Sequence, residues 1–258
     1  NVNVNLDAPF YFDGTDDFLH VAHHADFDAT NLGAKFTMSA WIYVDSNTGG
    51  DNVCILAKNG TSGGDAVRPY VLFYSHSNKI FRVYIGDGTT ATVFDSNVIT
   101  EDVWHHVAIT YNDSDDDIKM YVDGQSSGTG YTENLSYTRQ LSTASSGDKS
   151  LSIGGLYTND TGSGSNFFKG HISDVRFYSD DLTASEVAVL ASKINPDISL
   201  GAGSTDLVAH WSLLNGSVND AENATKGDSS TDHDLTAVGS PAQDYDAFSV
   251  DVYDNSTT

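Results

Sequence analysis

The chain has 258 residues, of which 39% are hydrophobic, including 13 Tyr, 12 Phe and 3 Trp. This is enough apolar material for the core of one large β-domain or two small ones. The formal net charge of −24 at pH 7 argues against binding to nucleic acid or to an anionic membrane, and no long apolar run favours membrane insertion.

Aspartate supplies almost all of the acid. Four of the 36 acidic residues are glutamates, which leaves 32 aspartates. Aspartate favours turns and is an oxygen ligand for hard cations. Two interpretations are compatible with this bias and with each other: a carboxylate surface that stays soluble in salt water or brine, and a set of calcium sites.

Alternating apolar and polar residues predict a series of short strands joined by Gly, Asn, Asp and Ser. Cys54 lies alone within one of these apolar segments, so no internal disulfide is expected. In chain order the expected strands are two within 8–21, then 36–44, 53–57, 70–74, 79–85, 91–94, 103–111, 118–122, 151–155, 167–178, 207–214 and 235–238.

The segment 103–124 predicts a long antiparallel hairpin around which the other strands are organised. Val107, Ile109 and Tyr111 alternate with smaller or polar residues, and 112–117 is entirely polar, as expected of a turn. Asp123-Gly124 is a second tight-turn signal.

One short helix is predicted over 182–192. Thr183 and Glu186 have the spacing of a capping box, and Leu182 and Val187 that of a hydrophobic staple. A helix of this length with one apolar stripe is expected to cover a sheet rather than to form a separate domain.

Several blocks occur in a characteristic order: FDGTDDFLHV from Phe12, FTMSAWIYV from Phe36, WHHVAITY from Trp104, MYVDG from Met120 and GHISDVRFYSDDLTASEVAVL from Gly170. Together they resemble the laminin-G/pentraxin-like branch of the concanavalin A-like lectin/glucanase superfamily. The resemblance implies an all-β fold, an antiparallel jelly-roll β-sandwich with one short helix after the late strands.

The resemblance divides the chain into a laminin-G-like jelly roll at 1–200 and a C-terminal segment at 201–258. In this superfamily a strand like LVAHWSLL, here at Leu207, commonly precedes the FDG block rather than following it. Either the domain is circularly permuted and this strand completes its own sandwich, or the strand pairs with a neighbouring copy.

Catalysis is not expected. Related glucanases carry paired carboxylates as a closely spaced Glu-x-Asp-x-Glu, whereas no two glutamates here are closer than Glu101 and Glu133, 32 residues apart.

Asp174 is the strongest metal candidate, because it lies in a strand expected to be half buried, where a carboxylate needs a partner. The resemblance implies a structural Ca²⁺ between such an acid and the early turn, with Asp13, Asp16 and the Gly14 carbonyl as the other ligands. The alternative is that Arg176 or the backbone satisfies Asp174. Three histidines, His20, His23 and His24, are too poorly aligned on a strand for a common zinc site.

A ligand-binding face is a further hypothesis, since aromatic rings stack on sugars and Arg or His donates to hydroxyls. The alternative is that these side chains form sandwich core or packed surface. The candidate residues are Trp41, Tyr70, Tyr74, His76, Arg82 and Tyr84.

These observations favour a non-catalytic, calcium-stabilised carbohydrate-binding or adhesion module, located extracellularly or on a cell or virion surface. Its expected partner is a glycan or cell-surface polysaccharide. The alternative is a structural subunit of a virion, tail fibre or surface filament, in which the jelly roll is a building block and the partners are copies of the same domain.

Overall fold

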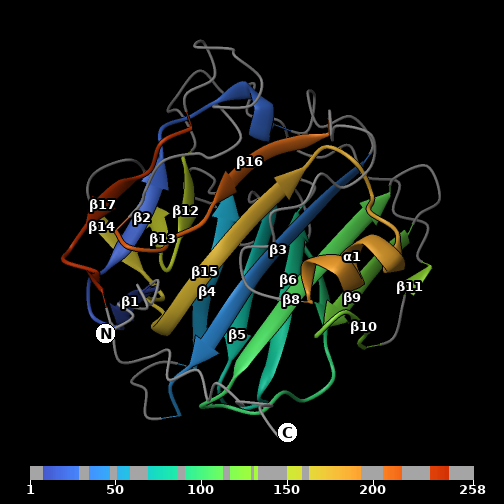
Figure 1. Cartoon of the computed structure of the whole chain (residues 1–258), viewed down its shortest axis with the longest axis horizontal. Helices are drawn as coiled ribbons and strands as arrows, with labels where there is room; N and C mark the ends of the chain where they lie inside the picture. The colour runs from blue at the N-terminus through green and yellow to red at the C-terminus, as the bar shows by residue number, and fades with distance from the viewer. Residues whose placement is uncertain are drawn as a thin grey trace, which may run out of the picture.

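The structure is a computed structural model that describes residues 8–28, 35–46, 51–58, 69–86, 91–112, 117–128, 131–132, 150–158, 163–192, 206–216 and 233–243. Two antiparallel sheets pack face to face with the apolar core between them (Figure 1). The chain is therefore mostly β, with the β-sandwich of a concanavalin A-like jelly roll, as the sequence predicts. No described helix has the length and apolarity needed to cross a bilayer.

The larger sheet has nine strands in the order β10-β9-β8-β3-β15-β1-β18, with β11 also paired to β9 and β16 to β15. Its strands are β1 (Phe10–Asp13), β3 (Lys35–Val44), β8 (Trp104–Asn112), β9 (Asp117–Val122), β10 (Gln125–Ser126), β11 (Tyr131–Thr132), β15 (Lys169–Tyr178), β16 (Leu207–Trp211) and β18 (Ala242–Gln243).

The second sheet has seven strands in the order β17-β2-β12-β4-β5-β6-β7. They are β2 (Phe18–Val21), β4 (Asn52–Lys58), β5 (Tyr70–Ser75), β6 (Ile80–Gly86), β7 (Ala91–Asp95), β12 (Leu151–Ile153) and β17 (Thr236–Val238), while β13 (Leu156–Thr158) and β14 (Ser163–Ser165) form a separate hairpin.

The hairpin predicted at 103–124 is confirmed. Val107, Ile109 and Tyr111 of β8 face the core, and β8 pairs along its length with β3 on one side and β9 on the other. After β9, Asp123 and Gly124 both have left-handed backbone angles, φ +50° and +72°, as a two-residue hairpin turn requires.

Helix α1 (Ala184–Leu190) covers part of the outer face of the nine-stranded sheet (Figure 1). The predicted capping box is present: the Glu186 N–H donates to Thr183 Oγ1 at 3.3 Å, and the Thr183 N–H donates to Glu186 Oε2 at 2.8 Å. Val187 and Leu190 pack in a small apolar cluster with sheet residues that include Tyr121.

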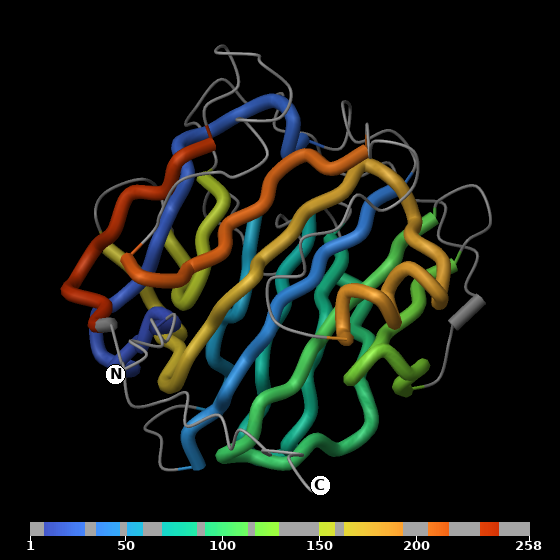
Figure 2. The backbone as a smooth tube through the Cα atoms, viewed as in Figure 1, coloured from blue at the N-terminus to red at the C-terminus, as the bar shows by residue number. Residues whose placement is uncertain are grey.

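The late part of the chain returns to the same sandwich. Strand β16 pairs with β15, β17 with β2 and β18 with β1, so the orange and red segments run beside yellow and blue ones in Figure 2. Trp211 of β16 is fully buried in the main core. Within one chain, this segment therefore supplies sheet strands and core side chains.

Strand β15 contains a β-bulge. Ser173 is opposite Trp41 of β3, but Arg176 is opposite Ser39, so β15 has one extra residue at this point. Asp174 lies in the bulge with a left-handed φ of +48°. The bulge changes which residues of β15 face the core: Ile172 and Val175 do, whereas the Asp174 side chain contacts Arg176 and His210.

Candidate functional site

A row of four rings crosses the outer face of the nine-stranded sheet. It consists of Trp104, Tyr43, His171 and Tyr11, on the adjacent strands β8, β3, β15 and β1, and each residue is directly opposite the next in the strand register. The ring centroids are 5.9 Å, 5.6 Å and 5.0 Å apart along the row, and neighbouring planes are inclined by 61°, 83° and 56°. We call these four residues the aromatic row.

The strand period places this row outside the core. Ile42, Val44 and Ile172 flank it in sequence and are fully buried in the core, so Tyr43 and His171 must face outward. His171 is buried beneath its neighbours, whereas Trp104, Tyr43 and Tyr11 keep part of their surface in solvent. Rings that are well packed yet partly exposed provide a rigid apolar surface at little cost in side-chain entropy.

A second line of side chains runs parallel to the aromatic row, two residues further along β3 and β8. The Trp41 and His106 rings lie 5.6 Å apart, and Ser39 follows on the same face of β3. Trp41 Nε1, His106 Nδ1 and Ser39 Oγ are buried and have no hydrogen-bond partner among the described residues. These three polar atoms lie beneath the accessible surface of this face.

Burial strongly affects His106, of which only 1% is exposed. Desolvation lowers the pKa of His106 to about 4, against the opposing attraction of Asp174 and Asp123. At neutral pH the ring is therefore uncharged and contributes one donor and one acceptor to this face.

Carboxylates border the aromatic row near Tyr43 and Tyr11. The Tyr11 hydroxyl donates to Asp45 Oδ2 at 3.1 Å, and the Ser46 N–H donates to Asp102 Oδ1 at 2.9 Å. Burial raises the pKa of Tyr43, and Asp102 and Asp45 add to this effect, so its phenol is neutral at ordinary pH. The row thus combines apolar ring surface with acceptors able to bind hydroxyl groups.

The turn after β1 gathers three carboxylates, from Asp13, Asp16 and Asp17, with one oxygen of each within 4.8 Å of the others. Asp17 is buried and accepts backbone N–H groups from Ser240 at 2.6 Å and from Asp13 at 3.2 Å. Burial raises the pKa of Asp17, the two N–H donors oppose this, and the charges of Asp13 and Asp16 reinforce it. Converging carboxylate oxygens on a turn fit the ligand chemistry of Ca²⁺.

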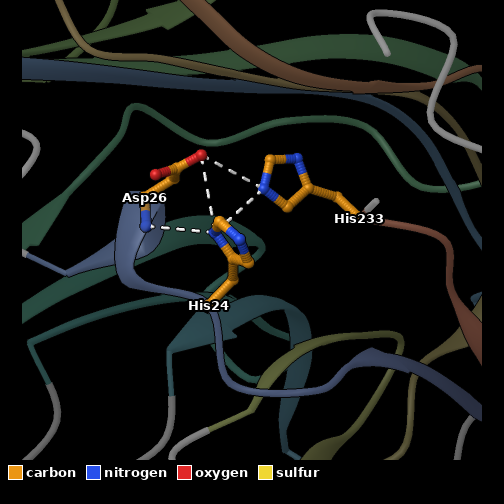
Figure 3. Close-up of side chains that lie close together, drawn as sticks. All are labelled: His24, Asp26 and His233. Atoms are coloured by element: carbon orange, nitrogen blue, oxygen red, sulfur yellow. Dashed lines mark hydrogen bonds and ion pairs between the residues drawn. The ribbon is translucent and has the colours of Figure 1, made fainter. Parts of the chain in front are cut away.

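A different cluster joins the two ends of the described chain. His24 caps the 3₁₀ turn η1 (Ala25–Phe27) and Asp26 lies within it; both meet His233, which precedes β17 (Figure 3). The sequence does not predict this grouping, because His24 and His233 are 209 residues apart in the chain. His20 and His23 are not members of this cluster.

The sequence profile described as "Concanavalin A-like lectin/glucanases superfamily" (Laminin_G_3) matches residues 13–188, which is more than half of the chain. The chain belongs to this superfamily. The resemblance predicted from the sequence blocks is thereby confirmed, and the sandwich described above is the fold of this superfamily.

Solved structures with this fold include carbohydrate-binding modules. A proposed carbohydrate-binding protein from Bacteroides ovatus is 18% identical with a TM-score of 0.60, covering 91% of this chain and 59% of its own. A heptameric SAP-like pentraxin from Limulus polyphemus is 16% identical with a TM-score of 0.53, covering 74% of this chain and 85% of its own. The CBM40 module of the Ruminococcus gnavus IT-sialidase is 16% identical with a TM-score of 0.51, covering 70% of this chain and 97% of its own.

Comparison with curated protein sequences gave no match. The chain spans 59% of the length of the Bacteroides structure. At these identities, the structural similarities show a shared fold, and the ligands of those proteins are not thereby assigned to this lectin-like chain.

The structure does not bring Asp174 to the early turn, contrary to the expected metal site. Asp13 is opposite Lys169 of β15, and Asp174 lies five residues further along that strand, about 16 Å at the usual strand rise. Asp174 instead accepts from Arg176 Nε at 2.8 Å and bonds His210 Nε2 at 2.7 Å. The alternative, in which Arg176 satisfies the acid, is what the structure shows. At the early turn, Asp17 lies beside Asp13, Gly14 and Asp16, and the sequence did not predict it as a ligand.

The predicted ligand face does not exist as one surface. Tyr70 and Tyr74 point into the main core, and the Tyr70 hydroxyl donates to the Phe27 carbonyl at 3.0 Å. The remaining candidates occupy two different sheets: Trp41 lies on β3, whereas Arg82 and Tyr84 lie on β6 and His76 follows β5.

The three candidates near the seven-stranded sheet have local partners. Arg82 forms a bidentate pair with Asp95 at 2.6 Å and 2.8 Å, and His76 Nδ1 bonds Glu101 at 3.0 Å. The Tyr84 ring packs against Phe73. Of the six predicted residues, only Trp41 lies beside the aromatic row. The members of the row itself were identified from the strand register and not from the sequence.

Proposed function

We propose that this chain is a non-catalytic carbohydrate-binding module whose glycan rests on the aromatic row. The observation that carries the proposal is the alignment of Trp104, Tyr43, His171 and Tyr11 across four strands on a face that α1 leaves uncovered in part. Sugar rings bind to aromatic surface through their C–H faces and to carboxylates and amines through their hydroxyls. The Bacteroides and CBM40 structures support this proposal through their shared fold.

Binding to an array of immobilised glycans, followed by calorimetry on the positives, tests the proposal. We expect Trp104→Ala and Tyr43→Ala to weaken binding by about tenfold or more, because each removes a partly exposed ring from the proposed contact surface. Tyr84→Ala is the matched control, since it removes an equally half-buried aromatic residue from the other sheet. Equal losses in all three variants, or no binding to any glycan, would refute the role of the row.

Calcium stabilisation is part of the proposal. Asp13, Asp16 and Asp17 would hold the ion, whose two positive charges would reduce the repulsion among three neighbouring carboxylates and fix the turn after β1. We expect the melting midpoint to fall on addition of EDTA and to recover with excess Ca²⁺, and Asp16→Asn to reduce that response. A midpoint unmoved by chelator at several salt concentrations would remove calcium from the proposal.

We further propose that the module acts outside the cell or on a virion surface, where glycans are displayed. The high aspartate content is compatible with such a setting, where salt water favours a carboxylate surface. The alternative role as a structural subunit predicts regular self-assembly without glycan binding, which light scattering and the array together distinguish.

A further inference from the structure

His24, Asp26 and His233 bring three potential metal-ligand atoms to one point (Figure 3). His233 Nε2 lies 3.2 Å from His24 Nδ1 and 3.4 Å from an oxygen of Asp26, and the same Asp26 oxygen lies 3.4 Å from His24 Nδ1. The three atoms therefore form a nearly equilateral triangle.

The size of this triangle matches a tetrahedral metal. Zinc binds imidazole nitrogen and carboxylate oxygen at about 2.0–2.1 Å, and in a tetrahedron such bonds separate the ligand atoms by about 3.3–3.4 Å. The observed edges of 3.2 Å, 3.4 Å and 3.4 Å lie at this value. Two imidazoles and one carboxylate are also a ligand set that transition metals accept, whereas Ca²⁺ prefers oxygen ligands alone.

Hydrogen bonding alone accounts for this geometry less well. The two imidazoles each lie 3.4 Å from the same oxygen of Asp26, whereas hydrogen bonds between a charged donor and a carboxylate are typically about 2.7–2.9 Å. The Asp26 N–H donates to His24 Nδ1 at 3.3 Å, a bond that a metal at this atom would replace. Two long imidazole–carboxylate contacts that share one oxygen leave the space between the three ligand atoms suited to an ion.

Neighbouring residues hold His233 in place, and His24 and Asp26 remain accessible to solvent. The His233 carbonyl accepts from Trp211 Nε1 at 2.9 Å, and the His233 ring packs on Phe27 with centroids 4.7 Å apart. The side chains of His24 and Asp26 remain 27% and 34% exposed, so solvent reaches the cluster. The nearby Lys58 ammonium pairs with Asp28 at 3.2 Å, so its charge is balanced without Asp26.

We propose that His24, Asp26 and His233 form a Zn²⁺-type metal site, with a fourth position open to water. The site joins the turn after β2 to the segment that leads into β17. The bound metal therefore fastens the C-terminal part of the chain to the body of the sandwich, independently of glycan binding and of the Asp13 turn.

Metal titration of the full-length, tag-free protein, first stripped with EDTA, tests this site. We expect one equivalent of Co²⁺ to give the visible absorption bands of tetrahedral coordination, and Zn²⁺ to displace it. At free Zn²⁺ about 100 times the dissociation constant, the melting midpoint should rise on the order of 5 °C.

The matched control is His23→Gln, which changes the neighbouring imidazole but leaves the three ligands intact. We expect it to keep the cobalt bands and the zinc-induced shift, whereas His24→Gln and His233→Gln lose both. Asp26→Asn tests the site without removing a buried ring, should the His233 variant fail to fold. Absence of the bands in the unmodified protein, or their persistence in His24→Gln and Asp26→Asn, would overturn the proposal.

Discussion

At the scale of single residues, the bulge in β15 determines what Asp174 does. Only 2% of Asp174 is exposed, and Arg176 on the same strand is equally buried. The favourable bonds from His210 and Arg176 outweigh desolvation and hold the pKa of Asp174 below its usual range. A buried carboxylate with two such partners needs no cation.

Removing this carboxylate leaves the Arg176 charge buried without its partner. We expect Asp174→Ala to reduce the free energy of unfolding by about 3–5 kcal/mol, and Asp174→Asn by less, because Asn tolerates the left-handed backbone and keeps an acceptor. Urea denaturation measures both values. The loss should be the same with and without EDTA; a loss that disappears under EDTA would return Asp174 to a metal site.

His106 makes stability depend on pH. Its pKa is lowered to about 4 in the folded chain, against about 6.5 when unfolded, so the unfolded state binds more protons between these values. Stability is therefore retained above about pH 6.5 and lost as the pH falls towards 4, by on the order of 3 kcal/mol from this group. Urea denaturation across this range should show a shallower decline for His106→Leu than for the unmodified protein; parallel curves would contradict the assignment.

The individual site residues show what a linear pattern predicts and what it does not. Strand period places Tyr43 and Trp41 on one face of β3. It excludes Tyr70 from a surface site only once the core-facing side of β5 is known. The bulge at Asp174 interrupts that period without a sequence signal. Contacts such as His24 with His233 depend on chain ends that meet only after folding, so the sequence did not predict them.

At the scale of elements, local signals were the most predictable. The capping box of α1 and the turn at Asp123-Gly124 each depend on residues that are close together in the sequence, and both are present. The order of strands in the sheets depends on contacts between distant segments. Periodicity predicts where the strands lie but not how they pair, so the jelly-roll arrangement was predicted from the family resemblance. The aromatic row follows from that order, since its four members lie on four separate strands.

The late strand β16 contributes to the core through Trp211, which lies against Phe27 with ring centroids 5.9 Å apart. We expect Trp211→Ala to reduce the free energy of unfolding by about 3–5 kcal/mol because it opens a large cavity. Chemical denaturation measures this loss, and Val98→Ala, at a position 71% exposed, should cost less than about 0.5 kcal/mol.

Light scattering and a C-terminal deletion test whether β16 pairs within its own chain in solution, as it does in the structure. If it does, light scattering should give a monomer at every concentration, and deletion from Thr205 onward should abolish cooperative unfolding. Polymers that grow with concentration would instead show that the strand is exchanged between copies.

At the scale of the whole molecule, the charge of −24 affects every ligand that approaches the sheet. Asp45 and Asp102 add local negative charge beside the row, where they raise the pKa of Tyr43. Neutral sugars are unaffected by this field, whereas the carboxylate of a sialic acid is repelled by it. The structurally similar CBM40 module has been solved with α2,3-sialyllactose bound, so sialylated ligands provide a direct test of this effect.

We therefore expect neutral oligosaccharides to bind more tightly than their sialylated counterparts, with the difference largest at low salt. Raising the NaCl concentration from about 0.01 M to 0.15 M shortens the screening length from about 30 Å to about 8 Å, so the affinity for the sialylated form should increase while that for the neutral form stays constant. Calorimetry with matched pairs of glycans at the two salt concentrations measures this. A sialylated glycan that binds more weakly as salt is added would reveal attraction by a cationic subsite and would contradict a field dominated by carboxylates.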